Sequence, residues 1–290
     1  MIYFVTNVFK WGRTGGPQTH ARNLELLLNR YATFEYTIVK DGFKEFFKSV
    51  APNSLIYVQS NIDLVRQAIQ AKARLIIGPN FIWNKKVDRS ILDYDHIIAV
   101  LVLRPDPAPY KLSPAWVDHI QYMPNFIDEE FWQPTTCTKT IDVLTVDKSF
   151  NYPEYTSNLN SLTKKLKSLK LRHIHLKKYT LKQLKEQLNC AKVLAFPSPR
   201  ESGASWAHVL LEANMMNVPV VGLSSVFKED NDEWDACRGS IAHSIDSMIA
   251  QIPSLVGTYD AYSPRQWAID HCGMKQAYQR LCKIMIHDDQ

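Results

Sequence analysis

Short apolar runs alternate with helix-like stretches along almost the whole chain, and this alternation restricts the folds that it can adopt. Several runs are apolar at every position, as expected for parallel strands that are covered on both faces. Strands alternating with helices imply βαβ units and a doubly wound sheet. The predicted strands are residues 2–8, 55–59, 74–78, 96–103, 143–146, 193–196 and 218–223.

Helical periodicity separates the predicted strands. Apolar residues share one helix face over residues 21–28 and again over residues 181–188. The second helix also has a start signal, because Thr180 and Gln183 have the spacing of a capping box. Both patterns predict amphipathic helices that pack against a sheet.

The pattern breaks near the middle of the chain. Residues 123–140, MPNFIDEEFWQPTTCTKT, form a proline-bounded stretch without periodicity, and a new strand is predicted from Ile141. Two halves of about 130 residues each fit the size of small domains. We therefore predict an α/β protein of two Rossmann-like, doubly wound domains, residues 1–130 and 131–265.

Composition excludes several other classes of protein. A chain with 46% hydrophobic and 22% charged residues is typical of folded soluble proteins and not of disordered ones. No apolar run approaches the roughly 20 residues that span a bilayer, and residues 1–9 lack the features of a signal peptide. The five cysteines are odd in number and widely spaced, so neither a disulfide framework nor a zinc site is expected. The cytoplasm is the expected location.

The net charge of +5 is unevenly distributed. Nine basic residues and no acidic residue lie within residues 164–185, so the rest of the chain carries 5 − 9 = −4. A solvated helix face is the simplest interpretation. A surface for an anionic acceptor, a membrane or nucleic acid is the alternative. The nine residues are Lys164, Lys165, Lys167, Lys170, Arg172, Lys177, Lys178, Lys182 and Lys185.

A glycine-containing loop follows the first predicted strand, in the sequence WGRTGGPQTHARNLELLL. Gly15 and Gly16 permit a tight turn, and Pro17 suits the first position of a helix. A helix N-terminus behind such a loop presents free N–H groups that suit a phosphate. A plain βα turn is the alternative, since neither G-x-G-x-x-G nor G-x-x-x-x-G-K-[ST] is present.

A second candidate site lies in residues 192–223, KVLAFPSPRESGASWAHVLLEANMMNVPVVGL. Glu201 is expected at the carboxyl edge of a buried strand, where open α/β sheets bind ligands, and Glu212 is expected on the next helix. Carboxylates there can accept hydrogen bonds from sugar and ribose hydroxyls, and the helix N-terminus around residues 203–206 can face a phosphate. Two surface glutamates are the alternative.

These segments resemble retaining glycosyltransferases of family 4, which have the GT-B fold. PSPRE followed by LLEANMMNVPVVG resembles the C-terminal signature of the family, and GGPQTHARNLELLL resembles its glycine loop and first helix. MPNFIDEEFWQP resembles the interdomain segment, and SPRQWAIDHCGMKQAYQRLCKIM resembles the closing helices. The matches occur in the family's order and span nearly the full chain. The resemblance implies that the two domains face each other across a cleft and that residues 266–290 cross back to the first domain.

The resemblance also implies contacts with the donor, at positions that partly depart from the family. Since 212 − 201 = 11, ten residues separate the two glutamates where the family has seven. Asn217 replaces a glycine, which a left-handed conformation tolerates, and Lys148 replaces an arginine. The implied roles are ribose binding for Glu212, sugar-hydroxyl binding and catalysis for Glu201, diphosphate binding and catalysis for Lys148, and donor binding for Gly15, Gly16, Asn80, Ser202 and Gly203.

The activity implied by the resemblance is metal-independent transfer of a hexose with retention of anomeric configuration. The donor would be a nucleotide sugar of the GDP-mannose or UDP-glucose type, and the acceptor a saccharide, glycoprotein or other glycoconjugate. No cofactor or nucleic acid is expected, membrane contact is peripheral at most, and a homodimer remains open. A nucleotide-sugar epimerase, a transferase that glucosylates DNA and a nucleotide-sugar binder without transferase activity remain as alternatives.

Two further observations bear on metals and origin. Asp93-Tyr94-Asp95 and Asp230-Asn231-Asp232 match the metal motif of the other glycosyltransferase fold, but chance explains matches this short. The nine histidines show no ligand spacing, so no metal site is predicted. With 290 residues the chain is compact for the family, as are members encoded by large DNA viruses of algae, which would act in the host cytoplasm.

Overall fold

The computed structural model describes residues 1–8, 16–59, 61–79, 91, 94–103, 118–147, 153–198, 208–223 and 237–286. The chain divides into two compact units. Unit 1 comprises Met1–Phe126 and Met274–Gln290, and unit 2 comprises Ile127–Gly273. The first part of unit 1 ends at Phe126, whereas the sequence suggested a boundary at residue 130. The C-terminal segment that belongs to unit 1 begins at Met274, whereas the sequence suggested residue 266. No helix in these ranges has the length and apolar character needed to cross a membrane.

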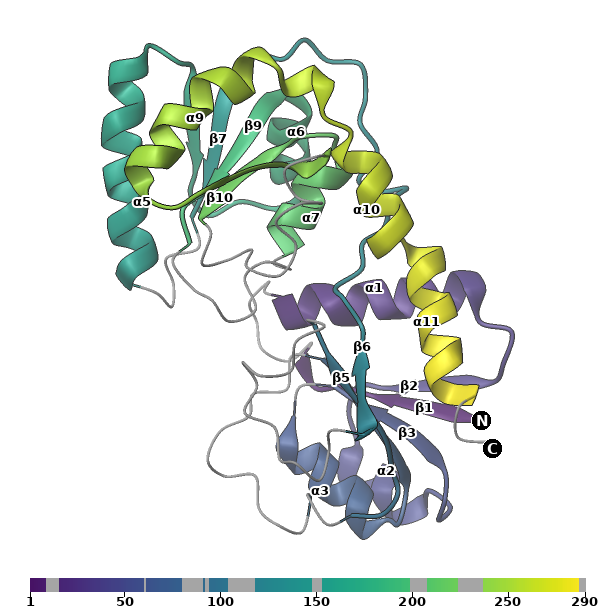
Figure 1. The fold of residues 1–290 in the computed structure, drawn as a ribbon. Coiled ribbons are helices and arrows are strands. Elements are labelled where there is room, and N and C mark those ends of the chain that lie inside the picture. Colours follow the sequence, from purple (N-terminus) through teal and green to yellow (C-terminus); the bar gives the residue numbers. More distant parts are fainter. Residues whose placement is uncertain are drawn as a thin grey trace. The chain divides into compact units, whose positions relative to one another are not determined.

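Unit 1 contains a parallel sheet of six strands in the order β2-β1-β3-β4-β5-β6. Helices α1 and α11 lie on one side of this sheet, and α2 and α3 lie on the other (Figure 1). The strands are β1 (Ile2–Val5), β2 (Tyr36–Val39), β3 (Leu55–Val58), β4 (Arg74–Ile77), β5 (Ile97–Val102) and β6 (Ile120–Tyr122). The helices are α1 (Gly16–Tyr31), α2 (Phe43–Ser49), α3 (Ile62–Gln70) and α11 (Met274–Ile286).

Each face of this sheet has its own hydrophobic core. Val5, Ile56 and Leu75 belong to the core beneath α2 and α3. Phe4 and Ile76, their neighbours in the chain, belong to the core beneath α1 and α11. Because successive side chains of a strand point to opposite faces, a strand between two cores must be apolar at every position.

Unit 2 contains a parallel sheet of five strands in the order β11-β10-β9-β7-β8. In Figure 1, α5 and α9 lie on one side of this sheet, and α6 and α7 lie on the other. The strands are β7 (Ile141–Val146), β8 (His173–Leu176), β9 (Ala191–Phe196), β10 (Val220–Leu223) and β11 (Gly239–Ala242). The helices are α5 (Pro153–Leu166), α6 (Leu181–Cys190), α7 (His208–Met215), α9 (Ile245–Gly257) and α10 (Pro264–Cys272), with short 3₁₀ helices η5 (Lys167–Leu169) and η8 (Tyr259–Ala261).

The local start signal of α6 is confirmed. The Thr180 hydroxyl accepts a hydrogen bond from the Gln183 amide at 3.2 Å, and the Gln183 side chain accepts one from the Thr180 amide at 2.9 Å. The two bonds satisfy donors that the first turn of a helix leaves without intrahelical partners. The capping box therefore determines where α6 begins.

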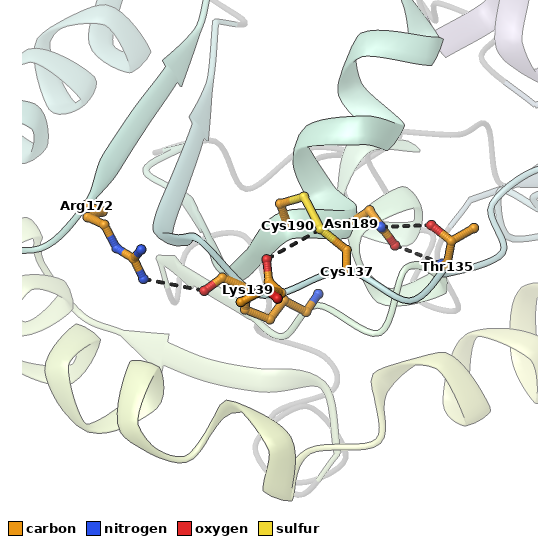
Figure 2. The surroundings of a disulfide bond; sticks show 7 residues. Thr135, Cys137, Lys139, Arg172, Asn189 and Cys190 are labelled. Atoms are coloured by element: carbon orange, nitrogen blue, oxygen red, sulfur yellow. Dashed lines mark hydrogen bonds between the residues drawn. A yellow bond between two sulfur atoms is a disulfide. The ribbon is translucent and has the colours of Figure 1, made fainter.

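Contrary to the expectation from cysteine spacing, unit 2 contains a disulfide between Cys137 and Cys190 (Figure 2). The two Cα atoms are 6.0 Å apart. Next to it, the Thr135 amide donates to Asn189 Oδ1 at 2.9 Å, and Asn189 Nδ2 donates to the Thr135 hydroxyl at 2.9 Å. The spacing failed as a guide because the two cysteines are 53 positions apart in the sequence and only the fold brings them together. The expected cytoplasmic location therefore loses the support of the cysteine pattern.

The disulfide is expected to contribute to stability. Replacing both Cys137 and Cys190 by serine should lower the free energy of unfolding by about 2–4 kcal/mol, because the cross-link restricts the unfolded chain. Urea denaturation measures this change, and Cys282→Ser, which alters a free cysteine, is the control. In the unfolded, unreduced wild type, iodoacetamide should label three of the five cysteines. Labelling of all five would contradict the assignment.

A second prediction concerns the close approach of β11 to β10. Gly239 has φ +143°, and a Cβ atom at this position would lie 2.6 Å from the Val220 amide nitrogen. Gly239→Ala should therefore lower the free energy of unfolding by about 3 kcal/mol or more. Gly257→Ala is the matched control, because a Cβ there meets no atom within 4 Å, and its effect should stay within about 1 kcal/mol. Equal urea midpoints for the two variants would contradict this packing.

Candidate functional site

Two of the eight residues expected at the donor site lie in the described ranges. Gly16 is the first residue of α1 in unit 1, and Glu212 lies on α7 in unit 2. The other six residues, Gly15, Asn80, Lys148, Glu201, Ser202 and Gly203, lie outside the described residues. The geometry of the candidate site is therefore built from Glu212 and the groups that hold α7.

Glu212 is a buried carboxylate on a buried helix. Its side chain is 3% exposed, and all eight residues of α7 are buried. The segment containing α7 follows β9, so Glu212 comes after the carboxyl end of a central parallel strand, where ligands bind in open α/β sheets. Burying a glutamate is costly unless its carboxylate interacts with polar groups. Such a residue suits a specific polar contact better than a solvated surface position.

The C-terminal end of α7 is held by Arg265 of α10. Arg265 Nη1 donates to the carbonyl oxygens of Met215 and Trp132, the latter at 2.9 Å, and Nη2 donates to the Glu129 carbonyl at 3.2 Å. The Arg265 amide also donates to Asn217 Oδ1 at 3.3 Å. The Arg265 guanidinium thus satisfies one carbonyl at the end of α7, that of Met215, which has no intrahelical partner, and joins this end to the segment 129–132.

Asn217, which stands where the family has a glycine, adopts the left-handed conformation that makes this replacement tolerable. Its φ is +55°, and the amide of the next residue, Val218, donates to the Ala213 carbonyl at 2.9 Å. This bond closes the helix in the manner of a left-handed C-cap, for which asparagine is the usual substitute for glycine. The replacement therefore preserves the turn that leads from α7 to β10.

A second arginine fixes α7 from the side of β11. Arg238 is 1% exposed, and its Nε donates to Asn214 Oδ1 at 3.0 Å. Its guanidinium carbon lies 3.7 Å from the centre of the Trp267 ring, which stacks on His271 with 4.5 Å between ring centres. Cation–π contacts of this kind gain strength when they are buried. Sequence reasoning missed Arg238 and Arg265 because isolated arginines carry no motif.

In unit 1, a buried polar cluster lies where β3 meets α1. His20 Nε2 and Tyr57 Oη are 3.2 Å apart, and both side chains are buried. Gln59 Nε2 donates to the Pro17 carbonyl at 2.9 Å, whereas Gln59 Oε1 has no hydrogen-bond partner among the residues that the structure describes. A buried acceptor of this kind suits a water molecule or a ligand hydroxyl. The only sequence signal was a histidine and a glutamine near predicted strand and helix ends.

Burial controls the charge of this cluster. It lowers the pKa of His20 to about 4, an effect that the Asn125 side chain partly opposes, and it raises the pKa of Tyr57. Both side chains are therefore neutral at physiological pH, where their contact is that of two uncharged groups. The cluster can bind hydroxyl or amide groups, but it offers no positive charge to a phosphate.

The two Asp-x-Asp matches gain no support as metal ligands. Asp95 is exposed, whereas Asp93, Asp230 and Asp232 lie outside the described residues. Among the residues that the structure describes, no three histidine, cysteine, aspartate or glutamate side chains form a group able to hold a metal ion.

Solved structures share this fold over nearly the whole chain. HepE of Anabaena, in complex with UDP-glucose, aligns with a TM-score of 0.68 and 12% identity over 99% of each chain. A glycosyltransferase of Rickettsia africae aligns with a TM-score of 0.68 and 9% identity, over 98% of this chain and 97% of that one. Sucrose-phosphate synthase of Thermosynechococcus elongatus aligns with a TM-score of 0.68 and 10% identity, over 99% and 98%.

The protein therefore has the GT-B fold with two Rossmann-like units, which confirms the fold class predicted from the sequence. At these identities the alignments establish the fold alone. Comparisons of the sequence with known protein families and with curated proteins find no match.

The buried histidine predicts a dependence of stability on pH. The folded pKa of His20, about 4, lies below its ordinary value of 6.5, because the buried imidazole resists protonation. The contribution of neutral His20 to the free energy of unfolding is therefore complete above about pH 6.5 and is lost as the pH falls toward 4. His20→Gln should remove up to about 3 kcal/mol of this loss, as measured by urea denaturation across that range. Part of the decrease in the free energy of unfolding with falling pH should remain in this variant, because burial also lowers the pKa of His173 to about 4. The same dependence of stability on pH in His20→Gln and wild type would contradict the lowered pKa of His20.

Proposed function

We propose that this chain is a glycosyltransferase that moves a hexose from a nucleoside diphosphate sugar to a saccharide or glycoconjugate acceptor. The single observation that carries the proposal is the buried Glu212 on α7, after β9, within the segment that resembles the family signature. The GT-B fold supports it, and one structure of the same fold contains UDP-glucose. UDP-glucose and GDP-mannose are the donor types that we propose.

The proposed roles follow the charge that develops during transfer. Glu212 would accept hydrogen bonds from the ribose hydroxyls, and Glu201 would bind hydroxyls of the transferred sugar. Lys148, with N–H groups near Gly15, Gly16, Ser202 and Gly203, would stabilise the negative charge on the leaving diphosphate. Asn80 would complete the donor contacts.

The chemistry proposed for this site is that of retaining family 4 enzymes. Transfer would keep the anomeric configuration and need no metal ion. As in those enzymes, the donor phosphate would accept the proton of the attacking hydroxyl, so no side chain is required as a base. Unit 1 is the proposed acceptor side. The cytoplasm stays the proposed location on the family resemblance alone, since the Cys137–Cys190 disulfide gives it no support.

The decisive experiment removes the carboxylate at Glu212 without changing its volume. Glu212→Gln should bind the preferred donor roughly 10- to 100-fold more weakly, because hydrogen bonds to a charged acceptor are lost, while the unfolding midpoint stays near that of the wild type. Calorimetric titration with a panel of UDP- and GDP-sugars measures the affinity. Glu186→Ala, which removes an exposed glutamate of α6, is the control and should bind the donor normally.

The outcomes separate this proposal from its alternatives. Equal donor affinity in wild type and Glu212→Gln would disprove the ribose-binding role. Binding without transfer or hydrolysis of any donor, with or without EDTA, would indicate a nucleotide-sugar binder. Conversion of the donor to an isomer without an acceptor would indicate an epimerase.

A further inference from the structure

The basic segment 164–185 surrounds an edge strand of unit 2. Its first residues end α5 and form η5, and its middle includes β8, which pairs with β7 at the end of the sheet order. Its last residues begin α6. This surface, defined by the nine basic residues of the segment, is called the basic edge below.

Most of the basic edge is exposed. Lys165 and Lys185 are half-buried, and the other seven basic side chains are exposed: Lys164, Lys167, Lys170, Arg172, Lys177, Lys178 and Lys182. They flank both ends of a strand of four residues, which spans about 13 Å. Such spacing suits an extended charged surface better than a compact site for one phosphate.

Little of this charge is neutralised within the protein. Lys165 pairs with Asp246, and Arg172 pairs with Asp142 at 3.5 Å, although Asp142 also binds Lys192 at 2.8 Å. Across the described ranges, the six exposed lysines of the basic edge have no ion pair. Glu186 borders the segment, and Asp147 directly follows the neighbouring strand, β7.

Two histidines of β8, His173 and His175, lie within reach of charged groups of the basic edge. Burial lowers the pKa of His173, and repulsion from His175 and Lys167 lowers it further. Burial also lowers the pKa of His175, where Asp147 opposes the effect and Lys177 adds to it. Because its six exposed lysines have no ion pair across the described ranges, the basic edge carries a positive potential that favours an anionic partner.

Protection of the edge strand does not account for these lysines. Natural edge strands often carry lysine within the strand to prevent pairing with another chain. β8 has the sequence HIHL and contains no lysine, and its Ile174 is 38% exposed. Ile174 instead lies as a partly exposed apolar side chain between the two groups of basic residues that precede and follow β8.

We propose that the basic edge of unit 2 binds the surface of a membrane that contains anionic lipids. The segment has eight lysines and one arginine, and clustered lysines suit diffuse attraction to anionic headgroups. Nucleic acid is the weaker fit, because its recognition favours the planar arginine fork and aromatic stacking. The segment supplies one arginine and one aromatic residue, the half-buried Tyr179. This inference does not depend on the proposed transferase activity.

The test is co-sedimentation of the full chain with vesicles. Vesicles of phosphatidylcholine with about 30% phosphatidylglycerol should bind the wild type at least tenfold better than pure phosphatidylcholine at about 0.1 M salt. At about 0.5 M salt the difference should largely disappear, since exposed charges are screened. Equal binding to both vesicle types would overturn the proposal.

Matched charge reversals locate the surface. The triple variant Lys164→Glu, Lys167→Glu, Lys182→Glu should lose at least roughly tenfold in binding to anionic vesicles. The control triple variant is Lys44→Glu, Lys48→Glu, Lys275→Glu, which changes three exposed lysines of unit 1. Its binding to anionic vesicles should stay within about twofold of that of the wild type. Each variant changes the net charge from +5 to 5 − 6 = −1, so a general charge effect would weaken both equally and overturn the proposal.

Two further measurements keep the result interpretable. Thermal unfolding shows whether each triple variant is folded. If a variant is unfolded, glutamine replaces glutamate at the same three positions, and a smaller loss of binding to anionic vesicles is expected for the basic-edge variant. A duplex DNA of about 20 base pairs serves as the competing partner. Tight DNA binding that the basic-edge variant abolishes, without binding to anionic vesicles, would show nucleic acid as the partner and overturn the proposal.

Discussion

Burial of the central parallel strands on both faces is the constraint on which the rest of the structure depends. In unit 1, Phe4 and Val5 are neighbours in β1 but enter different hydrophobic cores, and Ile56 and Tyr57 do the same in β3. Strands of this kind have no polar face, so functional groups must follow their ends. The Gln59 side chain comes directly after β3, and Glu212 lies on the helix that follows β9. Both positions are consequences of how the sheets are covered.

The same constraint explains how much of the fold the sequence predicts. The seven predicted strands correspond to β1, β3, β4, β5, β7, β9 and β10, which are the interior strands of the two sheets. The four strands that were not predicted, β2, β6, β8 and β11, are the four edge strands. In β8, for example, His173 and His175 alternate with Ile174 and Leu176, and none of the four is fully buried. An edge strand has a partner on one side only, so its sequence need not be continuously apolar.

The candidate site shows a similar division between local and long-range information. The left-handed position of Asn217 and the capping box of Thr180 follow from rules that act over a few residues, and both are confirmed. The disulfide and the two arginines could not be predicted, because their partners are distant in the chain. Arg265 binds a carbonyl 133 residues away, and Cys137 pairs with a cysteine 53 residues away. Such pairs exist only after the fold has formed.

The groups that position Glu212 have one further property in common. Arg238, Asn214, Arg265 and Trp267 all belong to unit 2, between Ile127 and Gly273. Arg265 satisfies the Met215 carbonyl at the end of α7, where positive charge is favoured by the helix dipole, and Arg238 joins the helix to the packed face of Trp267. The position of the Glu212 backbone is therefore determined by the interior of one unit. Any movement of one unit against the other would leave this part of the candidate site unchanged.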